Sequence, residues 1–273
     1  MKFIPSIKPL LLCLLIASLS AALAAQTNYL GFDRNLYPGD AAMKELRHTF
    51  AYTGYWLGNP PGERVNSWKG KRTMLAKEGW GFLLLFNGRD YAQLKGRPNP
   101  GARDGQAAVR SSAAEGFRRG SILFLDQEQG GRMLPEQKKY VIAWAEAVRR
   151  GGYRPGIYCS GIEVKEPDGT TITTARDLHD SLGDKLVFWI ANDACPPAPG
   201  CAYPKQLPAP EVSGAPFAEV WQFAQSPRRK EFTASCATTY NKDGNCYVPG
   251  VNPKLGLHLD LNVSRVPDPS QTR

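Results

Sequence analysis

The sequence is poor in the residues and motifs on which metal and nucleotide chemistry usually depend. It holds only three histidines, His48, His179 and His258, and none has the H-E-x-x-H spacing of a zinc hydrolase. No glycine-rich phosphate loop follows the first predicted strand, and no G-x-S-x-G elbow marks a serine hydrolase. We therefore expect no metal site and no cofactor.

Long apolar runs are also scarce. One lies at residues 10–17, after two lysines and before a series of small residues that ends at Ala25. This order predicts a Sec-type signal peptide over residues 1–25, and a secreted or periplasmic chain that begins at Gln26. Cys13 leaves lipoprotein processing open, although a leucine precedes it where such a signal needs a small residue. No other window approaches the roughly 20 apolar residues of a membrane span, so we expect no integral membrane segment after signal removal.

Acidic residues are outnumbered by basic ones. The chain has 34 Lys and Arg against 25 Asp and Glu, a formal net charge of +9. A basic exported protein is attracted to anionic surfaces, and cell-wall polymers and phospholipid headgroups both qualify. A solvated basic surface without a specific partner is the alternative. No nucleic-acid-binding motif is present, so we expect no nucleic-acid partner.

Five cysteines remain outside the predicted signal, and four of them form two closely spaced pairs. Cys195 and Cys201 bracket a loop rich in Pro and Gly, and Cys236 and Cys246 bracket a polar loop, while Cys159 stands alone. This distribution favours two local disulfides in an oxidising compartment, although the sequence allows other connectivities. A zinc site is a competing interpretation, which the absence of C-x₂-C spacing disfavours.

Eight short apolar runs with the character of strands follow one another along the chain. They are Tyr29–Asp33, Phe50–Tyr55, Trp80–Phe86, Ser121–Gln127, Gly156–Ser160, Leu186–Asn192, Glu219–Phe223 and Leu257–Asn262. Between the first six lie predicted helices near residues 40–48, 68–78, 104–118, 135–150 and 174–182. Alternating strands and helices predict parallel strands with right-handed crossovers.

The fold class that this pattern predicts is α/β, a TIM-like (β/α) barrel with eight strands. The last two connections lack helical periodicity, so helices should be missing near the C-terminal end of the barrel. We expect one barrel domain over residues 26–265 and a disordered tail over residues 266–273. An open, doubly wound sheet is the alternative architecture.

Acidic residues occupy the expected ends of the barrel strands, where functional groups of such barrels lie. They are Asp33 on the first strand, Asp126 and Glu128 on the fourth, and Asp260 on the eighth. Residues two apart on a strand point the same way, so Asp126 and Glu128 could both face a cleft. Neighbouring carboxylates raise the pKa of one of them, which lets it donate a proton, as glycosidic cleavage requires. The alternative is a solvated acidic loop, or one paired with Arg132.

Aromatic and amide side chains accompany these acids at the strand ends. Flat aromatic faces stack on sugar rings and amides bind hydroxyls, although core packing explains a single aromatic equally well. Strand alternation turns Cys159 away from its neighbour Tyr158, so this cysteine should be a buried structural thiol. The candidates for substrate binding are Tyr158, Trp189, Asn192, Trp221, Gln222 and Asn262.

Taken in order, the strand ends resemble those of the family-25 glycoside hydrolases, lysozymes that cleave peptidoglycan at muramic acid. They resemble still more closely a glycoside-hydrolase-like family catalogued as domain of unknown function 1906. The pieces that carry the resemblance are Gly31–Asp33, Asp126–Glu128, Trp189–Ala191, Trp221–Phe223 and Asp260–Asn262.

The resemblance implies Glu128 as the proton donor, with Asp126 orienting the N-acetyl group of the substrate. Asp33 and Asp260 would complete the acidic cleft. The sequence departs from the lysozyme pattern at Arg34 and Asn35, where small polar residues are favoured, and at Asn192, where an aromatic is common.

We therefore expect a monomeric, lysozyme-like glycosidase whose partner is a cell-wall polysaccharide, peptidoglycan. The alternative is a non-catalytic module that binds cell-wall glycan on the same barrel, because intact acids do not by themselves establish turnover.

The cysteine pattern gives a first prediction. In the exported protein, denatured without reductant, one thiol should react with an alkylating agent, and all five should react after reduction. Peptide mass mapping should join Cys195 to Cys201 and Cys236 to Cys246. A bridge that involves Cys159 would contradict its assignment to a barrel strand.

Overall fold

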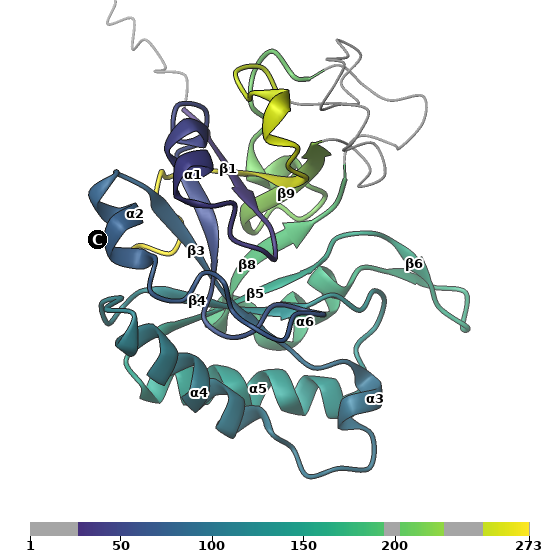
Figure 1. Cartoon of the computed structure of the whole chain (residues 1–273). Coiled ribbons are helices and arrows are strands. Elements are labelled where there is room, and N and C mark those ends of the chain that lie inside the picture. The colour runs from purple at the N-terminus through teal and green to yellow at the C-terminus, as the bar shows by residue number, and fades with distance from the viewer. Residues whose placement is uncertain (1–26, 194–202, 227–247, 273) are drawn as a thin grey trace, which may run out of the picture.

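The structure, a computed structural model, describes residues 27–193, 203–226 and 248–272. At its centre eight strands form a closed barrel in the order β1-β10-β9-β8-β5-β4-β3-β2 (Figure 1). They are β1 (Tyr29–Asp33), β2 (Tyr52–Trp56), β3 (Gly81–Asn87), β4 (Ile122–Gln127), β5 (Arg154–Ser160), β8 (Val187–Ala191), β9 (Ala218–Ser226) and β10 (Leu259–Ser264). The predicted eight-stranded α/β barrel is confirmed.

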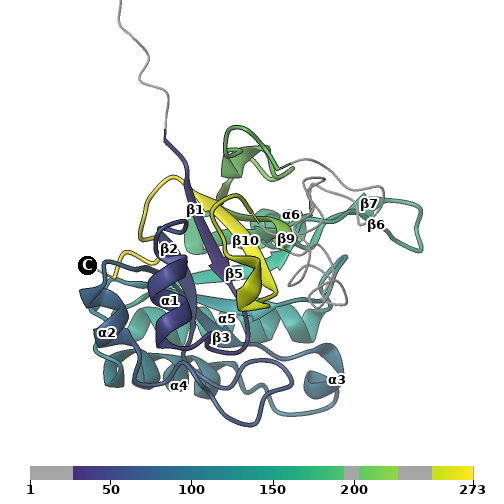
Figure 2. The ribbon, with the colours of Figure 1, turned by 45° about the horizontal axis from the view of Figure 1, so that its top comes forward.

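Helices cover the barrel unevenly. They are α1 (Asp40–Leu46), α2 (Arg72–Lys77), α3 (Tyr91–Leu94), α4 (Gly101–Ala114), α5 (Pro135–Arg150) and α6 (Thr174–Leu182). After α6, the described part of the chain has only 3₁₀ turns, at residues 183–185, 210–212 and 253–255, as the aperiodic connections predicted. A small hairpin of β6 (Val164–Lys165) and β7 (Thr171–Ile172) projects from one side (Figure 2). None of the helices in the described ranges is both long and apolar enough to cross a membrane.

The direction of the last strand corrects the prediction of an all-parallel barrel. β10 runs antiparallel to both of its neighbours, β1 and β9, whereas the other barrel pairs are parallel. The pairing sets Asp33 at the end of β1 opposite Asp260 near the start of β10. Asp260 therefore lies at the expected end of the barrel, although it stands near the start of its own strand and not at the end.

Strand alternation fills the barrel interior with large side chains. Phe124 and Trp189 meet edge to face, with ring centroids 5.7 Å apart, and Tyr158 packs on Trp189 at 4.7 Å. Trp189 and Phe124 are fully buried. The interior is thus a packed core below the acidic end, as in other barrels of this class, and not a pore.

Helices α4 and α5 lie side by side on one flank of the barrel (Figure 1). Two glycines one turn apart on α4 permit this contact. A Cβ atom would lie 2.4 Å from the carbonyl oxygen of Tyr140 at Gly101, and 2.6 Å from that of Trp144 at Gly105. Larger residues at either position would push α5 away from α4.

The prediction of a disordered tail is wrong for residues 266–272. Ser270 accepts a hydrogen bond from Ile122 N and donates its own N–H to Phe82 O, and the Asp268 carboxylate accepts from Phe82 N. Ser270 is fully buried. The tail therefore closes the amino-terminal ends of β3 and β4, and its Pro-rich composition gave no sign of these contacts.

The four cysteines predicted to form disulfides lie outside the described residues. Cys159 is a free thiol with no exposed surface, as expected, and burial raises its pKa well above the ordinary value. A buried neutral thiol of this kind is unreactive.

Candidate active site

Four carboxyl groups converge at the carboxyl ends of the parallel strands. Asp33 and Asp260 come from the paired strands β1 and β10, and Asp126 and Glu128 come from the end of β4. The charge of Glu128 acts on each of the three aspartates, and that of Asp33 acts on Asp126 and Asp260. The structure thus brings together the four acids that the sequence singled out.

Asp33 is the most firmly held of the four. Its Oδ1 accepts hydrogen bonds from Asn262 Nδ2 at 2.7 Å and from Gln222 Nε2 at 3.1 Å. Only 8% of its surface is exposed. Burial raises the pKa of Asp33 to about 6, although the two amide hydrogen bonds lower it, and the charge of Glu128 raises it further.

Each of these amides is oriented by an aromatic donor beneath it. Trp189 Nε1 donates to Asn262 Oδ1 at 2.8 Å, and Tyr158 Oη donates to Gln222 Oε1 at 2.9 Å. An indole N–H can only donate, so the Asn262 amide must turn its nitrogen toward Asp33. Burial raises the pKa of Tyr158 well above its ordinary value, so its hydroxyl keeps its proton. We call Asp33, Asn262, Gln222, Trp189 and Tyr158 the Asp33 network.

Asp126 and Glu128 differ in depth. Asp126 is 5% exposed, whereas Glu128 lies exposed at the rim. Burial raises the pKa of Asp126 well above its ordinary value, and the charges of Glu128 and Asp33 raise it further. Within the described chain, Asp126 Oδ1 has no hydrogen-bond partner. Of the two carboxyl groups at the end of β4, Asp126 is therefore the one whose ionisation burial disfavours.

The segment after Glu128 is anchored to three helices. Gln129 Oε1 accepts hydrogen bonds from Tyr91 N on α3 and from Gln137 Nε2 on α5. Thr174 Oγ1 on α6 donates to the carbonyl oxygens of Gln129 and Gly131. These contacts fix the backbone on which the exposed Glu128 is mounted.

Asp260 lies between two basic side chains. Its Oδ1 is 3.8 Å from His258 Nε2, and the positive charge of Arg34 acts on it. Burial raises the pKa of Asp260 well above its ordinary value, and the charges of Asp33 and Glu128 add to this effect, while Arg34 opposes it. Burial also lowers the pKa of Arg34.

The aromatic residues require correction. Trp189 is fully buried inside the barrel and has no face open to a ligand. Trp221 points to the outer side of β9, is 5% exposed and donates to Asn192 O at 2.7 Å. Asn192 donates to Ser213 O and holds a loop. Of the three predicted aromatic surfaces, only Tyr158 is partly exposed, because alternation along a strand gives the face of a residue but not its depth.

Sequence reasoning missed two residues that shape the site. A Cβ atom at Gly54 would lie 2.6 Å from the Asp33 Cβ, so glycine at this point on β2 makes room for Asp33. Arg34 Nε and Nη1 are buried and have no hydrogen-bond partner in the described part of the chain. Arg34 could have been found in the sequence because it directly follows Asp33, whereas nothing in the sequence marked Gly54.

Across the described ranges, no group of three or more His, Cys, Asp or Glu side chains has an arrangement that could hold a metal ion. The described site brings together carboxyl groups, amides, the Tyr158 hydroxyl, His258 and Arg34.

The sequence profile of the Rv2525c-like, glycoside hydrolase-like domain matches residues 58–230, more than half of the chain. The chain belongs to this family. The resemblance to a glycoside-hydrolase-like family is therefore confirmed. No curated protein matches the sequence.

Solved structures share the fold at low identity. An uncharacterized B. stearothermophilus protein is 19% identical, with a TM-score of 0.50 over 86% of this chain and 95% of that one. The Tat-secreted protein Rv2525c of Mycobacterium tuberculosis, in complex with L-tartrate, is 14% identical, with a TM-score of 0.50 over 87% and 95%. A family-25 glycosyl hydrolase from Bacillus anthracis is 11% identical, with a TM-score of 0.43 over 86% and 88%.

The buried state of Asp33 predicts how stability depends on pH. The unfolded chain releases this proton near pH 4, whereas the folded protein keeps it up to about pH 6. The folded state binds more protons in this window, so the free energy of unfolding falls as pH rises from about 4 to 6. Asp33→Asn, which keeps an acceptor for both amides, should remove on the order of 2–3 kcal/mol of this fall.

Urea denaturation between pH 4 and pH 7 measures the difference between parent and variant. Asp184→Asn, a matched change at an exposed position away from the network, should leave the pH dependence of the parent unchanged. Identical pH profiles for the parent and Asp33→Asn would show that Asp33 ionises without this penalty.

Proposed function

We propose that this chain is an exported glycoside hydrolase that cleaves a β-linked amino-sugar polymer, peptidoglycan. The observation that carries the proposal is the convergence of Asp126 and Glu128 with Asp33 and Asp260 at one end of the barrel. Glycosidic cleavage needs one carboxyl group to protonate the leaving oxygen and a second group to stabilise charge, attack, or activate water. Membership in a glycoside hydrolase-like family supports this assignment.

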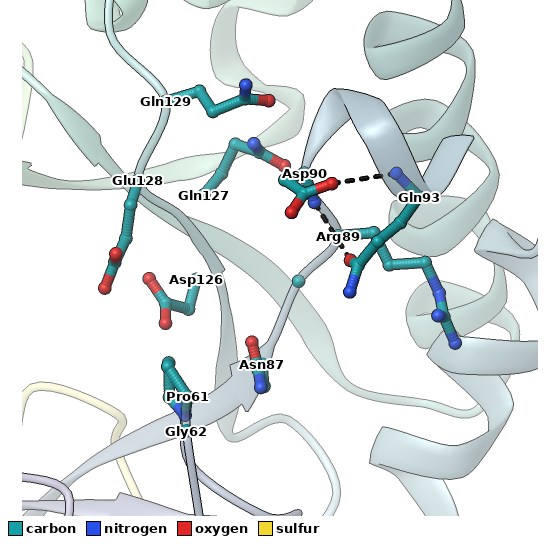
Figure 3. A pocket seen from close by; sticks show the side chains of 11 residues that line it. Pro61, Gly62, Asn87, Arg89, Asp90, Gln93, Asp126, Gln127, Glu128 and Gln129 are labelled. Carbon is teal, nitrogen blue, oxygen red and sulfur yellow. Dashed lines mark hydrogen bonds between the residues drawn. The ribbon is translucent and has the colours of Figure 1, made fainter. Parts of the chain in front are cut away.

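Glu128 is the general acid in this proposal. Its position at the rim gives it access to a glycosidic oxygen, and its side chain extends toward the same space as that of Asp126 (Figure 3). The proton of Glu128 passes to the leaving oxygen as the bond between that oxygen and the sugar carbon breaks. Water then supplies the hydroxyl group of the new reducing end, and its remaining proton returns to Glu128.

Asp126 orients the acetamido group of the substrate. It lies deeper than Glu128, and it lines the same cleft, where its carboxyl group can accept the acetamido N–H. The Asp33 network keeps a third carboxyl group in a fixed orientation beside it, with Asp260 on the far side of Asp33. Gln222 and Tyr158, the partly exposed members of the network with an amide and a hydroxyl, provide hydrogen bonds for sugar hydroxyls.

Export follows from the first 25 residues, which have the order of a signal peptide and contain no arginine pair. The relative Rv2525c is described as Tat-secreted. A Sec-type route to the outside or the periplasm, with a mature chain that starts at Gln26, fits the signal of this protein. The excess of Lys and Arg favours contact with anionic cell-wall material.

Glu128→Gln tests the acid directly. The variant keeps the shape of the side chain but has no proton to give, so turnover on purified peptidoglycan should fall about 10²-fold or more. Glycan binding and melting temperature should change little, since Glu128 is exposed and has no packing role. Release of reducing sugar measures turnover.

The matched control is Glu146→Gln, which alters an exposed glutamate on α5 whose ion pair with Arg150 is 3.6 Å long and solvated.

Asp126→Asn should slow cleavage mainly for substrates that carry the acetamido group. If the Glu128→Gln variant hydrolyses peptidoglycan at the parent rate, Glu128 is not the general acid. A parent protein that binds insoluble cell wall but releases no sugar would instead be a binding module.

A further inference from the structure

A cleft adjoins the candidate catalytic carboxyl groups on the side of the β3–α3 loop (Figure 3). It has a volume of about 300 Å³ and is formed by the β2–α2 loop at Pro61, residues 87–90 with Gln93, and residues 126–129. Asp126 and Glu128 therefore border both the barrel centre and this cleft. A volume of this size fits the lower end of small-ligand pockets.

The amide of Gln93 has a fixed orientation in this cleft. Asp90 N donates to Gln93 Oε1 at 3.1 Å, and Gln93 N donates to Asp90 Oδ1 at 2.8 Å, a capping box at the start of α3. The Gln93 oxygen is thus occupied, so its Nε2 is left to donate to a ligand. Asn87 lies opposite and donates its own amide N–H to Asn59 O at 3.3 Å, which leaves its oxygen as an acceptor.

The charges that face the cleft are negative. Arg89 belongs to the lining, but its guanidinium turns away to Asp104, with Nε 2.5 Å from Oδ2 and Nη2 3.2 Å from Oδ1 (Figure 3). Asp90 and Glu128 remain at the cleft as exposed carboxylates. An anionic ligand would meet repulsion from both, without a cation to offset it.

Two acceptors at the base of the cleft have no hydrogen-bond partner among the described residues. They are Asp126 Oδ1 and Gln127 Oε1, on side chains that are 5% and 2% exposed respectively. Both oxygens are covered by the surrounding protein, so the groups that can meet a ligand are the Gln93 amide N–H, the Asn87 oxygen and the exposed carboxylates. The described lining of the cleft thus offers a fixed donor and several acceptors but no free cation, which suits an uncharged ligand rich in hydroxyl groups.

We infer that this cleft is a subsite for a neutral sugar unit of the glycan, on the leaving-group side of Glu128. The inference rests on the proposed function, because a general acid must contact the oxygen of the departing sugar. A chain that crosses Glu128 from the barrel centre enters this cleft next. The subsite therefore selects, at this position, a sugar unit without a carboxylate.

Chitotetraose, a neutral β-linked N-acetylglucosamine oligomer, is the probe, and its binding is measured by calorimetry in the Glu128→Gln background. Gln93→Glu keeps the acceptor of the capping box but removes the amide donor and adds a negative charge beside that of Asp90. Loss of that hydrogen bond should weaken binding about tenfold. Gln106→Glu, the same chemical change on the exposed face of α4, should leave the affinity unchanged.

A second probe tests the charge. Chitotetraose with its primary hydroxyls oxidised to carboxylates should bind at least tenfold more weakly than the neutral oligomer, because Asp90 and Glu128 face it. This measurement uses the parent protein, so that Glu128 is present. It is made at low temperature to slow hydrolysis of the probe.

The outcomes separate the two proposals. If chitotetraose binding depends on Gln93 but the parent protein has no hydrolytic activity, the subsite is supported and the proposed enzymatic function is rejected. Hydrolysis that depends on Glu128 but an affinity unaffected by Gln93→Glu would overturn the subsite alone. The subsite proposal would also be overturned if chitotetraose does not bind, or if the oxidised oligomer binds as tightly as the neutral one.

Discussion

Burial of carboxyl groups at the end of a closed barrel is the constraint on which the rest of the site depends. Asp33 is almost completely covered, and two amide N–H groups at 2.7 and 3.1 Å compensate part of the cost of its ionisation. Those amides point correctly only because Trp189 and Tyr158 occupy their oxygens. The packed interior of the barrel and the chemistry of its rim are therefore one hydrogen-bonded unit.

The same constraint assigns different roles to four similar side chains. Asp33, Asp126 and Asp260 are buried enough for their pKa values to rise, while Glu128 stands exposed on a segment that α3, α5 and α6 hold in place. A buried aspartic acid with a raised pKa next to an exposed glutamate is consistent with the separate roles that we propose for Asp126 and Glu128. The side cleft at Gln93 continues this polar surface beyond Glu128, where we infer a subsite for the departing sugar.

Much of this arrangement could be predicted from the sequence, for definite reasons. Each barrel strand is a short apolar run, and acids at the run ends marked one end of the barrel, so Asp33, Asp126, Glu128 and Asp260 were found together. Apolar pattern does not encode strand direction, which is why the antiparallel β10 was missed, although Asp260 reached the expected end. Pattern also does not encode depth, so Trp189 was taken for a ligand surface when it is the support of Asn262. The tail at Ser270 was missed because its contacts are hydrogen bonds to the backbone of β3 and β4, which composition does not reveal.

The central claim is that burial at the end of the barrel raises the pKa values of Asp33, Asp126 and Asp260 above that of an exposed carboxyl group. Carbon-13 NMR titration of the side-chain carboxyl groups, with assignments from Asp33→Asn, Asp126→Asn and Asp260→Asn, measures this directly. The account predicts a midpoint near pH 6 for Asp33, and Asp126 and Asp260 still protonated well above pH 4. Midpoints near pH 4 for all three aspartates, as in an exposed acidic loop, would contradict it.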